Sequence, residues 1–484
     1  VQTVVYQNPE NGYAVLRVNT EDGQQITVVG TVPMTVPGER LIVTGKWGYH
    51  ASHGRQFEAE FLERLMPETG NEIFAYLASG AVKGIGEKTA EKILQLFGAR
   101  ALEVLESDPE QLAQIPGISR RKAHEIGESF RRQAGVRRLI EFLTLHRLPP
   151  ELAVRLFRVY GDLAEDALRD DPYLLTEPYF GADFAAVDAF ALELDVDADD
   201  ERRVEAGILF ELSYNLTNGH TFIPEKKLVP ATAALLNLDS ETIEDGIIRL
   251  DEQERMIRSS VAGLTACYLP EFYEAEQYIA ARLLKMADMR IEPPSRLEQM
   301  LRDIQARRAI DYAESQLQAI RDAATHQLLL VTGGPGTGKT TVMTGILDLL
   351  DAMGLKTQLA APTGRAAKRL SEVTGREATT IHRLLEAQLD QETGAMTFFH
   401  DEDEPLKCDA MIIDETSMVD LQLMMSLLKG LKPRCRLILV GDPDQLPSVG
   451  AGNVFSDIIR SGMAKTVRLT EIFRQARESL IVMN

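Results

Sequence analysis

The chain has 484 residues, with 52 Lys and Arg against 73 Asp and Glu, which gives a formal net charge of −21 at pH 7. A length of this size predicts about three or four domains, and 44% hydrophobic with 26% charged residues is typical of a folded chain rather than a disordered one. No apolar run approaches the roughly 20 residues of a membrane-spanning helix, and the three cysteines are too scattered for a disulfide framework or a zinc site. We therefore expect a soluble, cytoplasmic protein without a membrane partner.

Charge is distributed unevenly along the chain. The overall negative charge argues mildly against a nucleic-acid partner, because phosphate binding favours a positive surface. Residues 117–147, however, hold eight Lys or Arg and only three acidic residues. These residues predict either a local basic face or an ordinary solvated helix surface.

The first 66 residues alternate apolar and polar positions between turn residues, for example over 27–32 and 41–47. Such alternation predicts short half-buried strands, and hence a small β-domain over residues 1–66. A helical pattern with short Gly- and Pro-marked connections covers residues 67–228, and helical segments continue as a connecting region over 229–309.

Two glycine-containing segments lie within the helical region. Residues 82–93, with Gly84 and Gly86, resemble a helix-hairpin-helix element, in which a Gly-x-Gly turn and a helix N-terminus offer backbone N–H groups to a phosphate. Residues 115–123 resemble a second copy, with Gly117 at its turn and a serine in place of the second glycine. We expect Gly84, Gly86 and Gly117 to contact DNA. The alternative is that both elements serve only as packing scaffold.

From about residue 310 onwards, short apolar runs alternate with helical stretches. This alternation predicts an α/β domain over 310–484, with a parallel sheet covered by helices on both faces. The strands are expected at residues 327–332, 356–361, 410–414 and 436–440.

A phosphate-binding loop follows the first of these strands. Residues 333–340 fit the pattern G-x-x-x-x-G-K-[ST] between a strand and a helix-like segment, which is the context that the pattern requires. Lys339 is suited to neutralise the charge of the β- and γ-phosphates, and the Thr340 hydroxyl to coordinate Mg²⁺. The predicted nucleotide-binding residues are Gly334, Pro335, Gly336, Thr337, Gly338, Lys339, Thr340 and Thr341.

Two carboxylates end a later strand. The apolar run 410–413 is followed by Asp414 and Glu415. Side chains alternate along a strand, so the two acids point in different directions and can have different roles. Asp414 is placed to hold Mg²⁺, and Glu415 to orient and deprotonate an attacking water. Such a pair alone is more often a solvated loop, but together with the phosphate-binding loop it indicates nucleotide hydrolysis.

The strand at 436–440 is followed by a Pro- and Gly-rich segment, 441–450. Ligands of open α/β sheets lie beyond the carboxyl ends of the strands, so Gln445 in this segment is placed to contact the γ-phosphate or the water. The segment taken by itself is typical of a turn.

In this order the motifs resemble those of superfamily 1 helicases, and within them the RecD-like DNA helicases with an extended N-terminal region. Gln316 is similar to the adenine-recognising glutamine of that family, although a surface glutamine is the alternative. Arg474 is similar to the arginine that reaches the γ-phosphate from the first core domain. The resemblance implies a RecA-like ATPase domain over 310–484, ATP and Mg²⁺ as cofactors, and an OB-like β-domain over 1–66.

The resemblance also implies contacts with single-stranded DNA. Residues 361–367 and 379–385 are similar to two strand-binding motifs of the family. The DNA-binding residues it implies are Pro362, Thr363, Gly364, Arg365, Thr379, His382 and Asn453. The polar segment 386–407 looks like a hairpin, and in RecD-like relatives an insertion at this place forms the pin that separates duplex strands. An ordinary surface hairpin explains these residues equally well.

Superfamily 1 helicases build the ATP site between two RecA-like domains, and the motifs of the second domain are not found in this chain. An arginine from that second domain is worth roughly 10³ to 10⁵ in the rate of phosphoryl transfer. We therefore expect this chain alone to bind nucleotide but to hydrolyse it poorly.

These predictions favour an ATP-dependent DNA helicase of repair or recombination that moves along single-stranded DNA, 5′ to 3′ as in the RecD branch, and acts at junctions with duplex. The alternative is a non-motor P-loop ATPase switch that binds DNA in an ATP-regulated way. The ordered strand-binding motifs and Gln445 favour the motor. A small-molecule kinase fits poorly, because it leaves the helix-hairpin-helix elements without a role.

Overall fold

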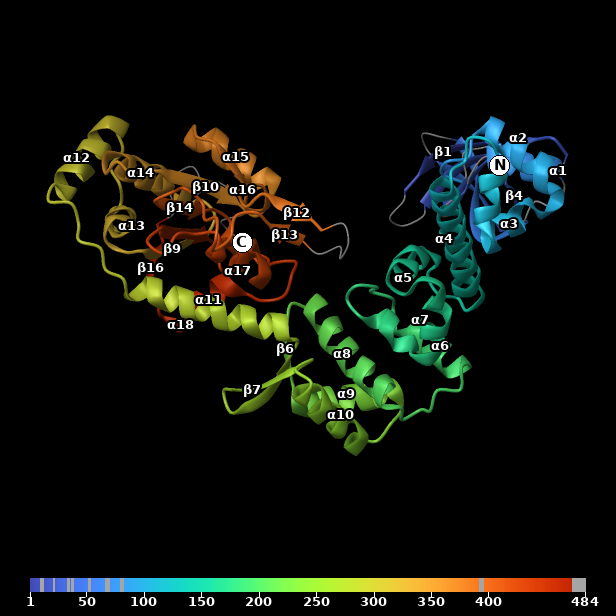
Figure 1. Cartoon of the computed structure of the whole chain (residues 1–484). Coiled ribbons are helices and arrows are strands. Elements are labelled where there is room, and N and C mark those ends of the chain that lie inside the picture. The colour runs from blue at the N-terminus through green and yellow to red at the C-terminus, as the bar shows by residue number, and fades with distance from the viewer. Residues whose placement is uncertain are drawn as a thin grey trace. The chain divides into compact units, whose positions relative to one another are not determined.

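The computed structural model describes residues 1–8, 13–20, 22–32, 35, 39–50, 54–65, 70–78, 82–390 and 396–471. The chain forms two compact units, Val1–Ala206 and Gly207–Asn484 (Figure 1). Across the described residues, no helix is both long and apolar enough to cross a membrane.

The first unit opens with the predicted β-domain. Its strands are β1 (Thr3–Gln7), β2 (Tyr13–Asn19), β3 (Gln25–Thr31), β4 (Arg40–His50) and β5 (Gly54–Leu65), in the order β1-β2-β3-β5-β4. Neighbouring strands are antiparallel except β3 and β5, which are parallel. Ala14, Leu16 and Val28 point into its core, as the alternation of apolar residues predicts.

Helices follow the β-domain, as predicted. They are α1 (Gly70–Ala78), α2 (Glu87–Phe97), α3 (Ala101–Ser107), α4 (Arg120–Leu145), α5 (Ala153–Tyr160), α6 (Ala164–Asp170), α7 (Phe184–Glu193) and α8 (Glu201–Thr217), and α8 continues into the second unit. Tyr76, Ile93 and Ile126 belong to the core of α1–α4. A buried ion pair, Arg137 to Glu39 at 2.6 Å, connects α4 to the β-domain.

The second unit begins with a mixed segment rather than a purely helical one. It contains β6 (Phe222–Pro224), α9 (Glu225–Leu236), α10 (Ser240–Glu252), β7 (Ile257–Val261), β8 (Leu264–Tyr268), α11 (Pro270–Asp288) and α12 (Leu297–Arg308). The helical prediction for 229–309 was therefore wrong for the β7–β8 hairpin. Its two-residue turn has Ala262 and Gly263 at φ values of 49° and 79°. Such turns favour Asn or Asp before the glycine, so an alanine at this position does not predict a hairpin.

The predicted parallel sheet is confirmed in the rest of the second unit. Its strands are β9 (Leu328–Gly333), β10 (Thr357–Ala361), β11 (Ala378–Thr380), β14 (Ala410–Ile413), β15 (Arg436–Gly441) and β16 (Lys465–Leu469), in the order β11-β10-β14-β15-β9-β16. Every neighbouring pair is parallel. The sheet's buried strands are continuous apolar runs, as expected when both faces are covered.

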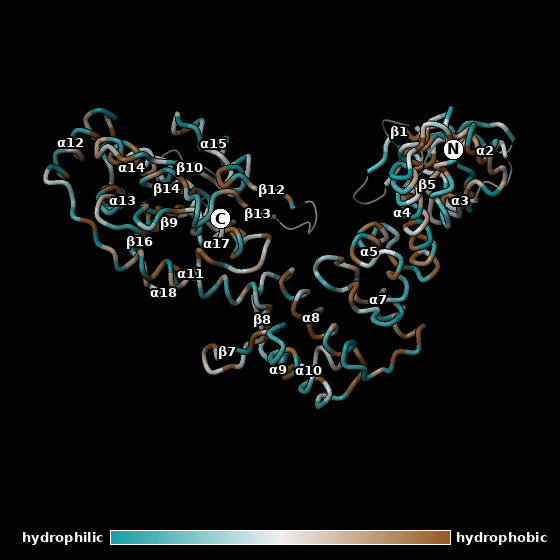
Figure 2. The backbone as a smooth tube through the Cα atoms, viewed as in Figure 1, coloured by the Kyte–Doolittle hydropathy of each residue, from teal (hydrophilic) through white to brown (hydrophobic). Residues whose placement is uncertain are grey.

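Helices cover both faces of this sheet (Figure 1). They include α13 (Glu314–Thr325), α14 (Lys339–Ala352), α15 (Gly364–Thr374), α16 (Ile381–Leu384), α17 (Leu421–Lys429) and α18 (Val454–Ser461). Leu330 and Leu439 pack in one cluster with α11 and α17, whereas Leu329 and Ile438 pack in the other with α13 and α14. Adjacent strand residues thus enter opposite layers, and the hydropathy of these elements is drawn in Figure 2.

A two-stranded hairpin follows α16. Its strands β12 (Ala387–Leu389) and β13 (Met396–Phe398) are antiparallel, and Leu389 pairs with Met396. The predicted centre of this hairpin, residues 392–394, lies outside the described residues.

Candidate nucleotide pocket and nucleic-acid surfaces

The phosphate-binding loop connects the buried strand β9 to α14. Gly336 and Gly338 have φ values of 79° and 81°, which an L side chain rarely adopts, so glycine is required at both turns. The Lys339 ammonium donates hydrogen bonds to the carbonyl oxygens of Gly333 at 2.5 Å and Gly334 at 3.1 Å. The Lys339 side chain therefore bonds to the backbone of its own loop.

A cavity of about 420 Å³ lies against this loop, within the size range of small-molecule sites. Its lining brings together the phosphate-binding loop, the carboxylates that follow β14, and Gln445, three of the segments that the sequence predicts for the nucleotide site. The lining residues are Gly334, Pro335, Gly336, Gly338, Lys339, Thr340, Thr341, Met343, Arg369, Leu370, Val373, Asp414, Glu415 and Gln445. This cavity is called the nucleotide pocket below.

The negative charges of the two pocket carboxylates, Asp414 and Glu415, have little to stabilise them. Burial and the neighbouring Glu415 raise the pKa of Asp414 to about 6, while Lys339 and Arg369 act in the opposite direction. Glu415 has a φ of 53°, a strained conformation for a residue with a side chain. Its Oε2 atom is buried and has no hydrogen-bond partner among the described residues. An unsatisfied buried carboxylate oxygen is costly unless a ligand or water bonds to it.

The pocket fits Mg²⁺ bound together with phosphates rather than a protein-only metal site. Thr340 and Asp414 supply a hydroxyl and a carboxylate oxygen, and Mg²⁺ is usually held by one or two carboxylates plus substrate phosphates. The described part of the chain contains no group of three or more His, Cys, Asp or Glu that could hold a metal by itself. The donor set present is thus the one that a magnesium–triphosphate needs.

Two predicted nucleotide-binding residues, Gln316 and Thr337, do not line the pocket. Gln316 is only 2% exposed and its Oε1 accepts a hydrogen bond from the Ala313 N–H at 3.1 Å, so it caps its own helix and does not line the pocket. Thr337 is buried, and its hydroxyl donates to the Gly334 carbonyl at 2.9 Å, which shapes the loop from within. Arg474 lies outside the described residues.

Most of the predicted strand-side residues gather at the carboxyl ends of β10 and β11. Pro362 follows β10, and the Thr363 hydroxyl caps α15 by accepting from the Ala366 N–H at 3.2 Å, which leaves Gly364 and Arg365 exposed in the first turn. β11 pairs with β10, so Thr379 and His382 are at the same edge. The Thr379 hydroxyl is buried without a hydrogen-bond partner in the described structure.

Asn453 lies apart from these residues, at the N-terminus of α18. It lines a different cavity of about 700 Å³, formed with residues of β6 and α11. The structure therefore does not bring Asn453 together with the residues at the ends of β10 and β11 in one cavity.

The first unit contains a basic groove of about 1110 Å³. Gly84 and the first turns of α4 contribute to it, and five of its side chains are cationic against three acidic ones. The lining residues are Lys83, Gly84, Ser119, Arg121, Lys122, Glu125, Ile126, Glu128, Ser129, Arg131, Arg132, Phe157, Gly161 and Asp162. Gly84 and Gly117 have φ values of 95° and 99°, as the predicted glycine turns require, but Gly86 and Gly117 do not line the groove.

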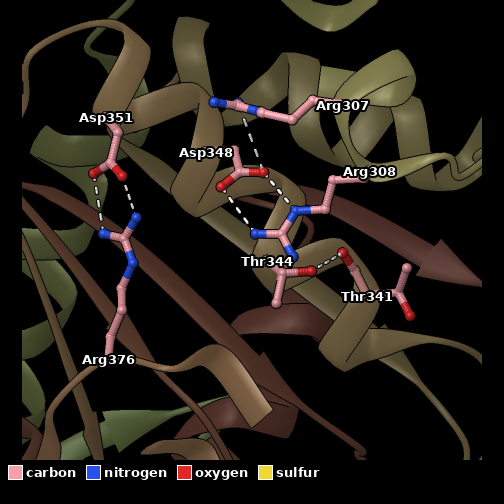
Figure 3. A network of polar contacts seen from close by, with 7 residues as sticks. All are labelled: Arg307, Arg308, Thr341, Thr344, Asp348, Asp351 and Arg376. Atoms are coloured by element: carbon pink, nitrogen blue, oxygen red, sulfur yellow. Dashed lines mark hydrogen bonds and ion pairs between the residues drawn. The ribbon is translucent and has the colours of Figure 1, made fainter. Parts of the chain in front are cut away.

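Ion pairs that sequence patterns did not reveal hold the helix of the phosphate-binding loop, α14 (Figure 3). Arg308 of α12 donates to both oxygens of Asp348, at 2.6 and 2.9 Å, and Arg307 lies 3.8 Å away. Arg376 forms a second two-bond contact, with Asp351. The hydrogen bond from Arg308 is the main cause that lowers the pKa of Asp348. These pairs are long-range in sequence and leave no local pattern.

Comparisons with known proteins agree with this architecture. Residues 1–67 match the OB-fold domain of the ATP-dependent DNA helicase YrrC, 74–132 a SAM-like helix-hairpin-helix tandem, 132–222 the helix-hairpin-helix domain of the ATP-dependent RecD2 DNA helicase, and 316–451 an AAA domain. The chain is 33% identical to the ATP-dependent RecD2 DNA helicase of Deinococcus radiodurans over 97% of its own length and 66% of that protein. It is 41% identical to the RecBCD enzyme subunit RecD of Mycolicibacterium smegmatis over 30% of each chain. It thus spans about two thirds of the length of the first relative and less of the second.

Proposed function

Because the chain belongs to the RecD2 type of superfamily 1 DNA helicases, we propose that it uses ATP to move along single-stranded DNA and unwind duplex. The observation that carries this proposal is the nucleotide pocket, where Lys339, Thr340, Asp414, Glu415 and Gln445 converge from three separate segments. A motor needs a site that both binds and hydrolyses a nucleoside triphosphate, and these side chains supply the groups for both steps.

Binding begins with an exchange of hydrogen bonds at Lys339. Its ammonium leaves the carbonyl oxygens of Gly333 and Gly334 and bonds to phosphate oxygens, which are stronger acceptors because they are charged. The backbone N–H groups at the start of α14 complete the anion site. Thr340 and Asp414 would hold Mg²⁺, which would neutralise charge on the phosphates.

Hydrolysis then depends on Glu415 and Gln445. The unpartnered Oε2 of Glu415 is available to accept a hydrogen bond from the attacking water and to take its proton. Gln445 lines the same pocket, which supports a role for it in orienting that water. The second core domain of this family contributes a further arginine, and full activity therefore requires a protein that carries both domains.

Single-stranded DNA is proposed to cross the carboxyl ends of β10 and β11. The exposed turn at Gly364 and Arg365 supports this, since it offers backbone N–H groups and a cation to successive phosphates. The hairpin β12–β13 follows directly and is proposed to separate duplex strands at its tip. Movement from 5′ to 3′ and a place in DNA repair or recombination are proposed from family membership.

A second DNA contact is proposed in the basic groove of the first unit. Lys83, Lys122 and Arg132 line it and have no ion-pair partner among the described residues. Unpaired cations beside a glycine turn and a helix N-terminus are suited to the phosphate backbone and not to base edges. We therefore propose binding without sequence preference.

The experiment that tests the motor is strand displacement by a protein that carries both core domains. With ATP and Mg²⁺ we expect release of a strand from a duplex with a 5′ single-stranded tail, and little release when the tail is 3′. ATP-dependent DNA binding without strand release would instead support the switch that the sequence left as the alternative.

A further inference from the structure

Arg369 is the one cation besides Lys339 among the residues that line the nucleotide pocket. It lies on α15, which follows β10, the neighbour of the strand β14 that Asp414 follows. Arg369 therefore approaches the pocket from the end where the two carboxylates lie. Gln316, the residue predicted to recognise adenine, belongs to α13, which lies toward the other end of the strand order.

The Arg369 guanidinium has no hydrogen bond or ion pair to any described residue, and the side chain is exposed. Its neighbours on the pocket wall, Leu370 and Val373, cannot pair with it. An arginine offers five donors in a planar fork that matches phosphate oxygens. Its charge acts on Asp414 in the same pocket, but no described residue bonds to it, so its donors are available beside the place where a terminal phosphate would lie.

Two of the contacts that hold α15 in place lie at its ends. The Thr363 hydroxyl caps its first turn. Just beyond its last turn, Arg376 pairs with Asp351 of α14, the helix that begins with Lys339 (Figure 3). Arg365 precedes Arg369 by four residues, so the two lie on one face of α15, one turn apart. The same helix face thus carries a strand-side residue and a pocket residue.

We propose that Arg369 is a positioning residue that binds the terminal phosphate of a nucleoside triphosphate in the nucleotide pocket, opposite Lys339. The proposal rests on the proposed function, because it assumes that the γ-phosphate lies at the Asp414 end of the pocket. Through Arg369, the first core domain would itself distinguish a triphosphate from a diphosphate. Arg369 lies on α15, the helix that begins at the proposed DNA-binding edge.

Equilibrium binding of fluorescent nucleotides to the chain of residues 1–484 tests this proposal. The ligands are a non-hydrolysable ATP analogue and ADP, each with Mg²⁺. Because a hydrogen bond to a charged group contributes about 1.5–3 kcal/mol, Arg369→Ala should weaken analogue binding roughly 10- to 100-fold and ADP binding less than about threefold. Arg369→Lys, which keeps the charge without the fork, should give an intermediate loss.

Lys368→Ala is the matched control, because Lys368 is exposed on the same helix turn but does not line the pocket. It should bind both nucleotides as the parent does. Equal losses for the analogue and ADP with Arg369→Ala, or no loss with either, would overturn the proposal. Unchanged thermal unfolding midpoints exclude misfolding, and Arg369→Gln is the second variant if Arg369→Ala unfolds.

Different results would contradict the proposed function and the assignment of Arg369. If the parent chain binds neither nucleotide, or if Lys339→Ala binds both as tightly as the parent, the proposed function fails. If Lys339→Ala loses binding and Arg369→Ala does not, the proposed function stands and only the assignment of Arg369 is wrong.

Discussion

The ammonium nitrogen of Lys339 lies 2.5 Å from the carbonyl oxygen of Gly333, so the residue that would neutralise a phosphate instead bonds to its own loop. With the bond to Gly334, this contact occupies two of the three N–H donors of an ammonium that lines the pocket. A phosphate needs only to replace a neutral acceptor with a charged one, without moving a strand or helix. The site is therefore prepared for nucleotide, and the following predictions depend on that arrangement.

Glu415→Gln should preserve nucleotide binding and lower hydrolysis by about 10²- to 10⁴-fold, the range for loss of a general base. Glutamine keeps the size of the side chain but cannot take a proton from water. Phosphate release measured with single-stranded DNA, in a protein with both core domains, gives the rate. Asp414→Asn is the comparison and should lose Mg²⁺-dependent binding itself. Hydrolysis at the parent rate in Glu415→Gln would exclude Glu415 as the base.

Asp348→Asn should lower the free energy of unfolding by about 1–2 kcal/mol, because it removes a two-bond contact with Arg308 in which the Asp348 side chain is only 12% exposed. Asp351→Asn is the control and should cost less than about 1 kcal/mol, since its side chain is 47% exposed. Urea unfolding at pH 7 measures both. Equal losses of unfolding free energy in the two variants would show that the Arg308 contact stabilises the fold no more than the Arg376 contact does.

The same pair predicts a pH dependence. Arg308 lowers the pKa of Asp348 in the folded state, so the stabilisation is fully present above the unfolded-state pKa of about 3.9 and is lost as the pH falls through the lower folded-state value. The difference in unfolding free energy between the parent and Asp348→Asn should hold constant from pH 7 to about 5 and shrink below about 4. A difference that grows on acidification would contradict this sign.

Arg132→Glu should weaken binding of the chain to a 5′-tailed duplex and lower the slope of log K against log salt by about one. Arg132 lines the basic groove, whereas Arg158, on α5, is exposed and does not. Arg158→Glu makes the same charge change and should have a smaller effect. Fluorescence anisotropy over a salt series gives both quantities. Identical slopes for the two variants would indicate a general charge effect and no groove site.

Leu389 and Met396 face each other across the β12–β13 hairpin and are 58% and 54% exposed. Replacing both with serine should reduce strand displacement while ATP hydrolysis on single-stranded DNA continues, if apolar side chains at the hairpin tip stack against the opened base pair. Gln388→Ser, one residue away, is the control. Parallel loss of both activities would point to a folding defect instead of a pin.

The sequence predicted four of the six strands of the parallel sheet, because their evidence was local, but it did not predict the two edge strands β11 and β16. The loop at 333–340, the apolar run before Asp414 and the turn after residue 440 each combine a strand pattern with a chemical requirement. The β7–β8 hairpin escaped prediction because Ala262 stands where such turns favour Asn or Asp before the glycine.

Parts of the pocket depend on tertiary structure that single segments do not encode. Gln316 fits the adenine-recognising pattern, yet in the structure its side chain caps α13. Arg369 was overlooked, although its spacing of four residues from Arg365 could have placed both on one helix face. The Arg308–Asp348 contact joins elements far apart in the chain, and no local sequence pattern indicates the positive φ of Glu415.

A crystal structure of this chain with Mg²⁺ and a non-hydrolysable ATP analogue would test the central claim most directly. We predict the triphosphate in the nucleotide pocket, with the Lys339 ammonium moved from Gly333 to the phosphate oxygens and the metal beside Thr340 and Asp414. A nucleotide bound elsewhere, for example in the cavity beside Asn453, with Lys339 still bonded to Gly333, would contradict the account.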